Sequence, residues 1–302
     1  MRLRHVASGV LLAASLLACA REARRPPAAP EHDVTRPVRF VPADVDLVLR
    51  LDVRRFREVV GAAPELALER LWEGFGPGSE QPADTRKALT RLFESCESLW
   101  LGCRLSAMGC RDFTLVLRGQ WQSSLRDFGF TDSRNKRDLG GGWLSYDFSS
   151  APRSSIARVY WKPPELAVLV SSAELDAAER AIEQSADSAR LEPSEDGLLS
   201  LVARSRGLAR LMRERSPKGA DWLEKSEQVE LHFDPTAGGT LATFTVLFDD
   251  EALAKRSTDA FRLLVTAVAG FDPRFNVNQV TAQQLGSSVI LRVVVPTQER
   301  AP

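Results

Sequence analysis

The chain has 302 residues, with 40 Lys and Arg against 40 Asp and Glu, so its formal net charge at pH 7 is zero. A composition of 44% hydrophobic and 26% charged residues is that of a globular protein and excludes disorder for most of the chain. Because the charges cancel, the chain has no long-range positive field to gather nucleic acid, and we predict no nucleic-acid partner.

The N-terminus has the features of a signal peptide that ends in a lipidation motif. Arg2 and Arg4 precede an apolar run from Val6 to Ala18, which is too short to span a bilayer. Lipoprotein processing attaches a diacylglycerol thioether to a cysteine that follows a small residue, and Cys19 directly follows Ala18. We therefore predict a signal peptide over residues 1–18 and lipid attachment at Cys19. The alternatives are a plain secretory signal cut nearby and an N-terminal helix.

The residues after the cysteine predict where the anchored protein lies. Ala20 resembles an outer-membrane address under the sorting rule of enteric bacteria, in which Asp at this position causes inner-membrane retention. Residues 19–36 are rich in Pro and Arg and are typical of a tether, which at about 3.1 Å per residue reaches roughly 50 Å. We expect a protein bound to the membrane through its N-terminal lipid, at the periplasmic face of the outer membrane.

Folded structure is predicted to begin at Pro37. Apolar residues at 45, 47, 49 and 51 alternate with polar ones as in a half-buried strand, and a helix follows near Phe56. The segment from Val41 to Phe56 holds a Pro-Ala-Asp turn, a strand ending in Asp-Val and a helix beginning Arg-Phe. This segment resembles the start of uncharacterised lipoproteins and periplasmic proteins of high-G+C Gram-negative bacteria, including myxobacteria. The resemblance implies an α+β envelope protein and transfers no site residue.

The rest of the first half alternates predicted helices and strands. Helical spacing follows Pro64 and Asp84, and the glycines between Gly74 and Gly78 indicate a loop, because no strand precedes them as in a phosphate-binding loop. Ser171 and Glu174 predict a capping box for a helix that ends near Glu183. Strands are predicted at Ser98–Leu105, Asp112–Arg118, Trp143–Phe148, Ile156–Trp161 and Leu166–Val170.

The second half is predicted in a similar order. A strand over 197–203 precedes helices at 207–215 and 220–225. In the strand over 228–233, Phe233 is expected in the core and His232 in solvent. A hairpin connection at 234–239 leads to a predicted strand over Leu241–Phe248. A helix then begins after its cap Asp249 and ends at Gly270. The last two predicted strands, Phe275–Gln284 and Ser287–Val295, are joined by a turn at Gly286.

Hairpin connections between consecutive strands predict an α+β fold of mostly antiparallel sheets with packed helices. The two halves share an element order, and Phe113–Leu117 is echoed by Phe244–Phe248. Either one α+β unit is duplicated, with domains at 37–190 and 191–302, or the chain forms one α+β domain with a long mixed sheet.

Three cysteines lie in the part of the chain predicted to be exported into an oxidising compartment. Cys103 and Cys110 flank a predicted hairpin turn and form the possible disulfide, and a bridge from Cys96 to Cys110 is the rival. A zinc site would need a fourth ligand and closer thiol spacing, so we predict no metal and no cofactor.

No sequence motif indicates catalysis, and we predict that the protein is not an enzyme. The nucleophile-elbow pattern is absent, Asp44 and Asp46 are expected to face water, and His232 is the only histidine of the folded part. We predict a non-enzymatic binding or structural module with an envelope protein as its possible partner. One alternative is a carrier for an apolar ligand, with Trp100, Trp121, Trp143 and Trp161 lining a sheet face. Another is a cryptic hydrolase in which His232 and acidic residues converge.

Overall fold

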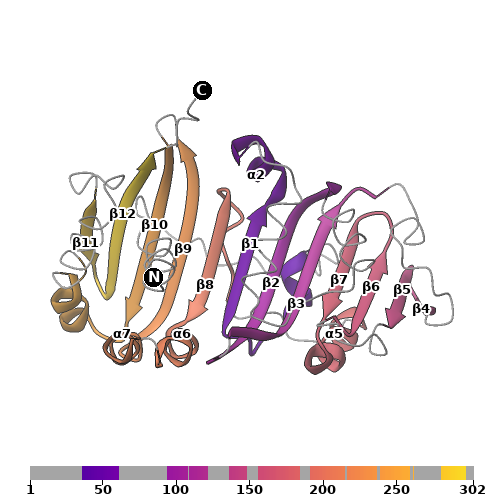
Figure 1. The fold of residues 1–302 in the computed structure, drawn as a ribbon, viewed down its shortest axis with the longest axis horizontal. Coiled ribbons are helices and arrows are strands. Elements are labelled where there is room, and N and C mark those ends of the chain that lie inside the picture. Colours follow the sequence, from indigo (N-terminus) through magenta and orange to yellow (C-terminus); the bar gives the residue numbers. More distant parts are fainter. Residues whose placement is uncertain are drawn as a thin grey trace, which may run out of the picture. The chain divides into compact units, whose positions relative to one another are not determined.

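The computed structural model describes residues 36–60, 94–107, 109–121, 136–147, 156–183, 191–214, 216–236, 239–258, 261 and 280–296. The chain divides into two compact units, which are considered one at a time. The first unit holds Pro37–Glu192 and Arg210–Pro217, and the second holds Pro193–Ala209 and Lys218–Pro302. Antiparallel strands with a few helices make up each unit (Figure 1), so the predicted α+β class is confirmed. The duplication of one unit stays a prediction.

In the described residues of the first unit, seven antiparallel strands form a sheet. The longest pair is the hairpin of β2 and β3, which joins Ser106 to Gly109 at its tip. In spatial order the strands are β1 (Leu47–Asp52), β2 (Cys96–Ser106), β3 (Gly109–Gly119), β7 (Leu166–Val170), β6 (Arg158–Lys162), β5 (Trp143–Asp147) and β4 (Lys136–Gly140).

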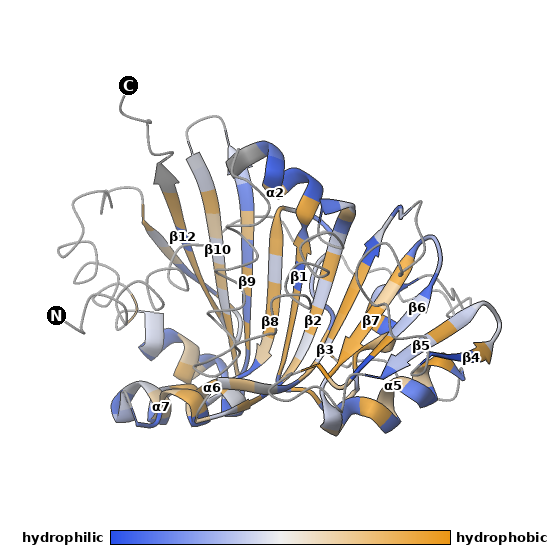
Figure 2. Ribbon diagram, turned by 45° about the vertical axis from the view of Figure 1, so that its right-hand side comes forward, coloured by the Kyte–Doolittle hydropathy of each residue, from blue (hydrophilic) through white to orange (hydrophobic). Residues whose placement is uncertain are grey.

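One face of this sheet is almost entirely apolar. A single cross-strand row joins Leu49, Leu101, Leu115, Leu169 and Val159. Directly opposed residues point to the same face, so this row forms a continuous hydrophobic band. Figure 2 shows the corresponding hydrophobic colouring on the central strands. All five residues of β7 are buried, as expected for the middle of a sheet that is covered on both sides.

Short helices contribute to the opposite face. They are η1 (Pro37–Phe40), η4 (Ser172–Glu174) and α5 (Leu175–Ile182), while α2 (Val53–Val60) follows directly on β1. Phe40 makes an edge-on ring contact with Trp143, with 5.4 Å between centroids. Val41, which follows η1, packs against β2 at Gly102. A Cβ atom at Gly102 would lie 2.3 Å from Cγ1 of Val41, so glycine at this position allows the close contact.

The predicted capping box before α5 is wrong. Ser171 makes no side-chain cap, and its Oγ instead accepts a hydrogen bond of 3.0 Å from the backbone N–H of Phe113. The backbone N–H of Ser171 also donates to the carbonyl of Phe113. A contact with β3 therefore takes the hydroxyl that local sequence assigned to the helix. The sequence prediction also missed β4, all five residues of which are exposed.

The part of the second unit that the structure describes contains a five-stranded antiparallel sheet. Its strands in spatial order are β11 (Thr281–Leu285), β12 (Ser288–Pro296), β10 (Gly239–Phe248), β9 (Ser226–Thr236) and β8 (Leu199–Arg204). The helices α6 (Ser205–Met212) and α7 (Pro217–Leu223) follow β8, and the boundary between the units falls inside α6. Residues 251–258 are also helical. The N-terminal cap of this helix is Asp250 and not the predicted Asp249, because Asp250 Oδ1 accepts a hydrogen bond of 2.7 Å from the backbone N–H of Leu253.

Aromatic side chains pack the core of the second unit. Trp222 makes edge-on contacts with Phe248 and Phe261, at centroid distances of 5.5 and 4.4 Å, and Phe244 also contacts Phe261. On β9, however, Phe233 and His232 are both half-buried, so the predicted contrast between a core and a solvent position is wrong. Strand β9 also continues through Thr236 instead of ending at the predicted hairpin connection.

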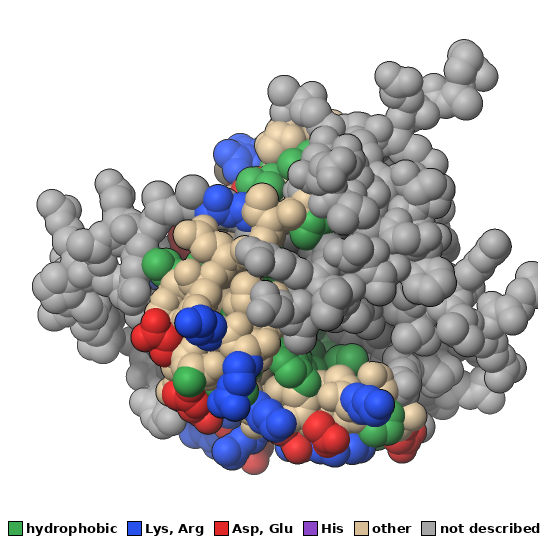
Figure 3. All heavy atoms as spheres, turned by 90° about the vertical axis from the view of Figure 1, so that its left-hand side faces the viewer, with side chains coloured by type: hydrophobic (Ala, Val, Ile, Leu, Met, Phe, Trp, Pro, Cys, Tyr) green, Lys and Arg blue, Asp and Glu red, His purple; other side chains and the backbone are tan. Residues whose placement is uncertain are grey.

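The surface carries both signs of charge. Seen from the side of β11, basic and acidic side chains are interspersed (Figure 3), which agrees with the equal numbers of each in the sequence. Among the residues that the structure describes, no helix combines the length and the apolar character needed to cross a membrane.

Candidate functional site

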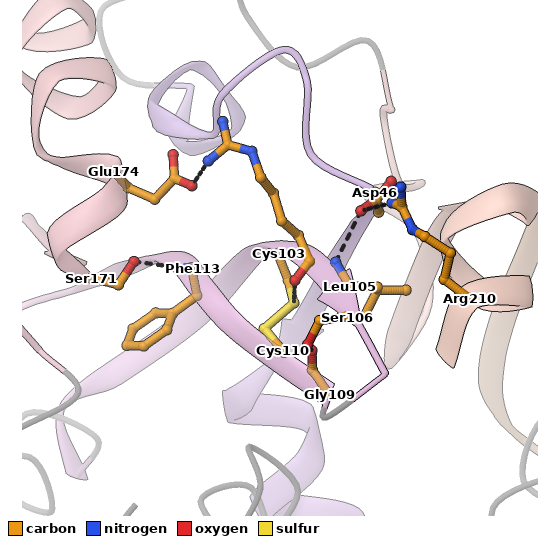
Figure 4. The surroundings of a disulfide bond; sticks show 11 residues. Asp46, Cys103, Leu105, Ser106, Gly109, Cys110, Phe113, Ser171, Glu174 and Arg210 are labelled. Atoms are coloured by element: carbon orange, nitrogen blue, oxygen red, sulfur yellow. Dashed lines mark hydrogen bonds and ion pairs between the residues drawn. A yellow bond between two sulfur atoms is a disulfide. The ribbon is translucent and has the colours of Figure 1, made fainter. Parts of the chain in front are cut away.

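The strongest chemical feature of the first unit is a disulfide across the β2–β3 hairpin. Cys103 and Cys110 are joined, with their Cα atoms 5.7 Å apart (Figure 4). The register pairs Cys103 with Phe113 and Cys110 with Leu105, so the bridge runs diagonally beside the irregularity at Arg104. Cys103 is buried and Cys110 is half-buried. The bond therefore fixes the end of the hairpin where the ladder is irregular.

Arg104 anchors this hairpin to its surroundings. Its Nη1 forms an ion pair with Oε1 of Glu174 on η4, and its Nη2 donates to Oδ1 of Asp44 at 2.7 Å. The Glu174 side chain is only 1% exposed, whereas that of Asp44 is 70% exposed. One guanidinium thus holds a buried and a solvated carboxylate, and Figure 4 shows Glu174 directed toward the hairpin.

Asp46 is a second anchor and does not face water as expected. It is buried, and its Oδ2 accepts hydrogen bonds from the backbone N–H of Leu105 at 2.9 Å and from Nη2 of Arg210 at 2.6 Å. All three residues belong to the first unit. The alternation in the first strand predicts that Asp46 faces solvent, because the pattern of a single strand does not show the distant backbone N–H and guanidinium that bind it.

Cys96 is the remaining cysteine of the described residues and carries a free thiol. Its Sγ lies 3.1 Å from the carbonyl oxygen of Ser98. Burial raises the pKa of Cys96 to about 12, so the reactive thiolate is scarce at neutral pH. This thiol behaves as a small core side chain rather than as a nucleophile.

A polar cluster connects α5 to the sheet. Arg158 on β6 forms ion pairs with Asp147 on β5, at 3.2 Å, and with Glu179 on α5. The hydroxyl of Tyr160 donates to Glu179 Oε1 at 3.2 Å. Burial raises the pKa of Tyr160 to about 12, so the phenol stays protonated and can serve as this donor. The network links α5 to two strands from a buried phenol to a partly exposed carboxylate.

His232 tests the hydrolase hypothesis. Its Nε2 lies 4.0 Å from a carboxylate oxygen of Glu230, and burial lowers the pKa of His232 against the opposing effect of Glu230, Asp234 and Asp196. Its cross-strand neighbour Ser200 is fully buried, and the Ser200 Oγ accepts a hydrogen bond from the backbone N–H of Ser194. Acidic groups do lie near His232, as the hydrolase hypothesis expects. The hydroxyl of Ser200, however, is buried and is not exposed as a nucleophile would need to be.

The tryptophans considered for an apolar carrier site do not line one sheet face. Trp100 shares a cross-strand row with Tyr160, whereas Trp161 follows Tyr160 in β6 and points to the opposite face. Trp121 packs against Trp161, with 5.0 Å between centroids. These three and Trp143 are each at most 5% exposed. They are core residues of the first unit.

Several predicted features lie outside the described residues. They are Cys19, the tether up to residue 35, and the loop between Gly74 and Gly78. In the described part of the chain, no group of three or more His, Cys, Asp or Glu side chains is arranged to hold a metal ion.

Comparison with known proteins identifies a similar fold and no family. No protein-family model matches the chain, and no curated protein sequence matches it. Three crystal forms of the protein TP0453 are similar in structure, with TM-scores of 0.55, 0.54 and 0.53 at 11%, 12% and 11% sequence identity. Each alignment covers 86% of this chain, and 92%, 95% and 93% of the respective TP0453 chains. At this identity the likeness shows a shared fold.

Proposed function

We propose that the chain is a lipid-anchored envelope protein, attached through Cys19 at the periplasmic face of the outer membrane, and that its folded part is a non-enzymatic binding module. The observation that carries the proposal is the disulfide between Cys103 and Cys110. Structural disulfides persist in oxidising compartments outside the cytoplasm, which is where the predicted signal peptide would direct the chain.

A second observation supports the binding role. Asp46 and Ser171 are buried polar residues of the first unit, and each accepts a hydrogen bond from a backbone N–H, while Asp46 also accepts one from Arg210. Buried polar groups used in this way fix the packing of elements and leave recognition to the surface.

The test is to follow acylation and fractionation of Cys19→Ala in cells supplied with an alkyne-labelled fatty acid. We expect the wild type to carry the label in the outer-membrane fraction, and the variant to lose the label and leave that fraction. Cys96→Ala is the matched control, because it removes a cysteine that cannot be the lipid site, and it should keep both properties. An unlabelled wild type, or a labelled Cys19→Ala, would refute the anchor.

A further inference from the structure

A cleft of about 370 Å³ lies at one end of the sheet in the first unit. Strand β2 begins there, β3 ends there, and the turn from β6 to β7 closes one side. This volume is within the range of about 300 to 1,000 Å³ that small-molecule sites occupy. None of the residues that line it has a role in the anchors described above.

The walls of the cleft are held by backbone hydrogen bonds. The N–H of Gly119 donates to the carbonyl of Glu165 at 3.1 Å, and the N–H of Trp121 donates to the carbonyl of Pro164 at 3.0 Å. A Cβ atom at Gly119 would lie 2.3 Å from the carbonyl oxygen of Ser95, so the strands meet here as closely as a backbone permits. The shape of the cleft is therefore built into the ends of the strands.

The side chains that line the cleft carry charges of both signs. Arg118, Glu97 and Glu165 are all exposed, and in the described part of the chain no ion pair joins any two of them. Trp121, which also contributes to the lining, is only 2% exposed. A cation and two carboxylates thus share one hollow with an anchored indole ring and do not neutralise each other by direct contact.

We propose that this cleft binds a small zwitterion, with Arg118 binding its oxyanion and Glu97 and Glu165 binding its ammonium group. A guanidinium forms paired hydrogen bonds with carboxylate or phosphate oxygens. An ammonium group gains from the nearby charge of two carboxylates. Free amino acids and phosphoethanolamine headgroups share this chemistry. The inference rests on the proposed binding role and is independent of the lipid anchor.

Calorimetric titration of the full-length, detergent-solubilised protein tests the charge requirement. The probes are glycine, which carries both charges, and acetate and methylammonium, which carry one each. We expect glycine to bind at least about tenfold more tightly than either single-charge probe. An affinity for acetate or for methylammonium equal to that for glycine would overturn the proposal.

Two charge-removing variants assign the binding to the cleft. We expect Arg118→Gln and Glu165→Gln each to weaken glycine binding at least about tenfold. The matched controls are Arg137→Gln and Glu183→Gln, which remove exposed charges of the same unit outside the cleft and should leave the affinity unchanged. All four should unfold at the temperature of the wild type, because the substituted side chains are exposed. Equal loss in variants and controls would contradict the assignment.

A third probe distinguishes the two sources of the ligand. Glycerophosphoethanolamine is soluble and carries the phosphodiester and ammonium groups of a lipid headgroup. Tighter binding than glycine identifies the headgroup as the source, and weaker binding identifies a free amino acid. If neither zwitterion binds, the cleft inference fails, whereas the acylation test of Cys19 is unaffected and judges the proposed envelope role separately.

Discussion

The histidine of β9 gives the stability of the second unit a predicted dependence on pH. Burial lowers the pKa of His232 in the folded state below its value in the unfolded chain, about 6.5. Above that pH both states are neutral. As the pH falls through 6.5, the unfolded chain takes up a proton before the folded chain does, so stability is lost until the folded-state pKa is reached.

We therefore expect His232→Gln to lose less stability than the wild type between pH 7.5 and pH 5. Denaturant unfolding at the two pH values measures the difference, and Glu227→Gln, at an exposed position of the same strand, is the control. A variant that loses as much stability as the wild type over this interval would show that His232 titrates normally.

Glu174 and Asp44 provide a matched comparison, because both bond the guanidinium of Arg104. Removing the buried partner leaves a partly buried charge without its main counterion, and we expect Glu174→Ala to lower the free energy of unfolding by about 2 to 3 kcal/mol. Asp44 is largely exposed, so Asp44→Ala should cost less than about 1 kcal/mol. Chemical denaturation measures both variants, and equal costs would contradict the unequal burial on which this prediction depends.

Cys96 should be the one described cysteine that an alkylating reagent modifies without prior reduction, and only after unfolding. Its thiol is buried and its pKa is raised to about 12. We expect no modification of the native protein at pH 8 and modification of Cys96 in denaturant. Rapid modification of Cys96 in the native protein would show that the thiol is accessible, and the Cys96→Ala variant checks the assignment of the modified peptide.

The disulfide should stabilise the β2–β3 hairpin through its effect on the unfolded chain. For a bridge between cysteines seven positions apart, the loop-entropy model gives about 2 to 3 kcal/mol. We expect the Cys103→Ala/Cys110→Ala variant to lose that much stability and to be insensitive to reductant, whereas the wild type should fall to a similar stability on reduction. Wild-type unfolding that is the same with and without reductant would show that the bridge contributes nothing.

Elements with one apolar face were predictable from sequence, and elements defined by distant partners were not. The alternation of leucines predicted β1, and apolar runs predicted β2, β3 and β7 to within a few residues. Strand β4 has no apolar pattern, because both of its faces are exposed, and only its pairing with β5 defines it. Ser171 shows the same limit, since its hydroxyl bonds to Phe113, which is 58 residues away.

The site residues followed the same rule. The thiols of Cys103 and Cys110 could be proposed as a pair because they flank a local turn. Arg104, Glu174 and Arg158 were missed, because their partners come from separate elements and a charged residue in a strand is normally assigned to solvent. The available signal was their position: Arg158 lies in a short strand whose middle three residues are all buried.

For the whole chain, a predicted export signal precedes two α+β units. The predicted domains at 37–190 and 191–302 and the proposed lipid anchor rest on sequence alone, whereas the two units and the disulfide belong to the structure. The proposed anchor and the disulfide fit one location, because lipidation follows export and structural disulfides persist in oxidising compartments.

Intact-mass spectrometry of the protein extracted from membranes, after alkylation without reductant, tests this link most directly. The account predicts a chain that begins at Cys19, carries the mass of a diacylglyceryl group and attached acyl chain on that residue, and after unfolding takes up one alkyl group, at Cys96. A chain that begins at Met1, a Cys19 without lipid, or alkylation of Cys103 and Cys110 would contradict it.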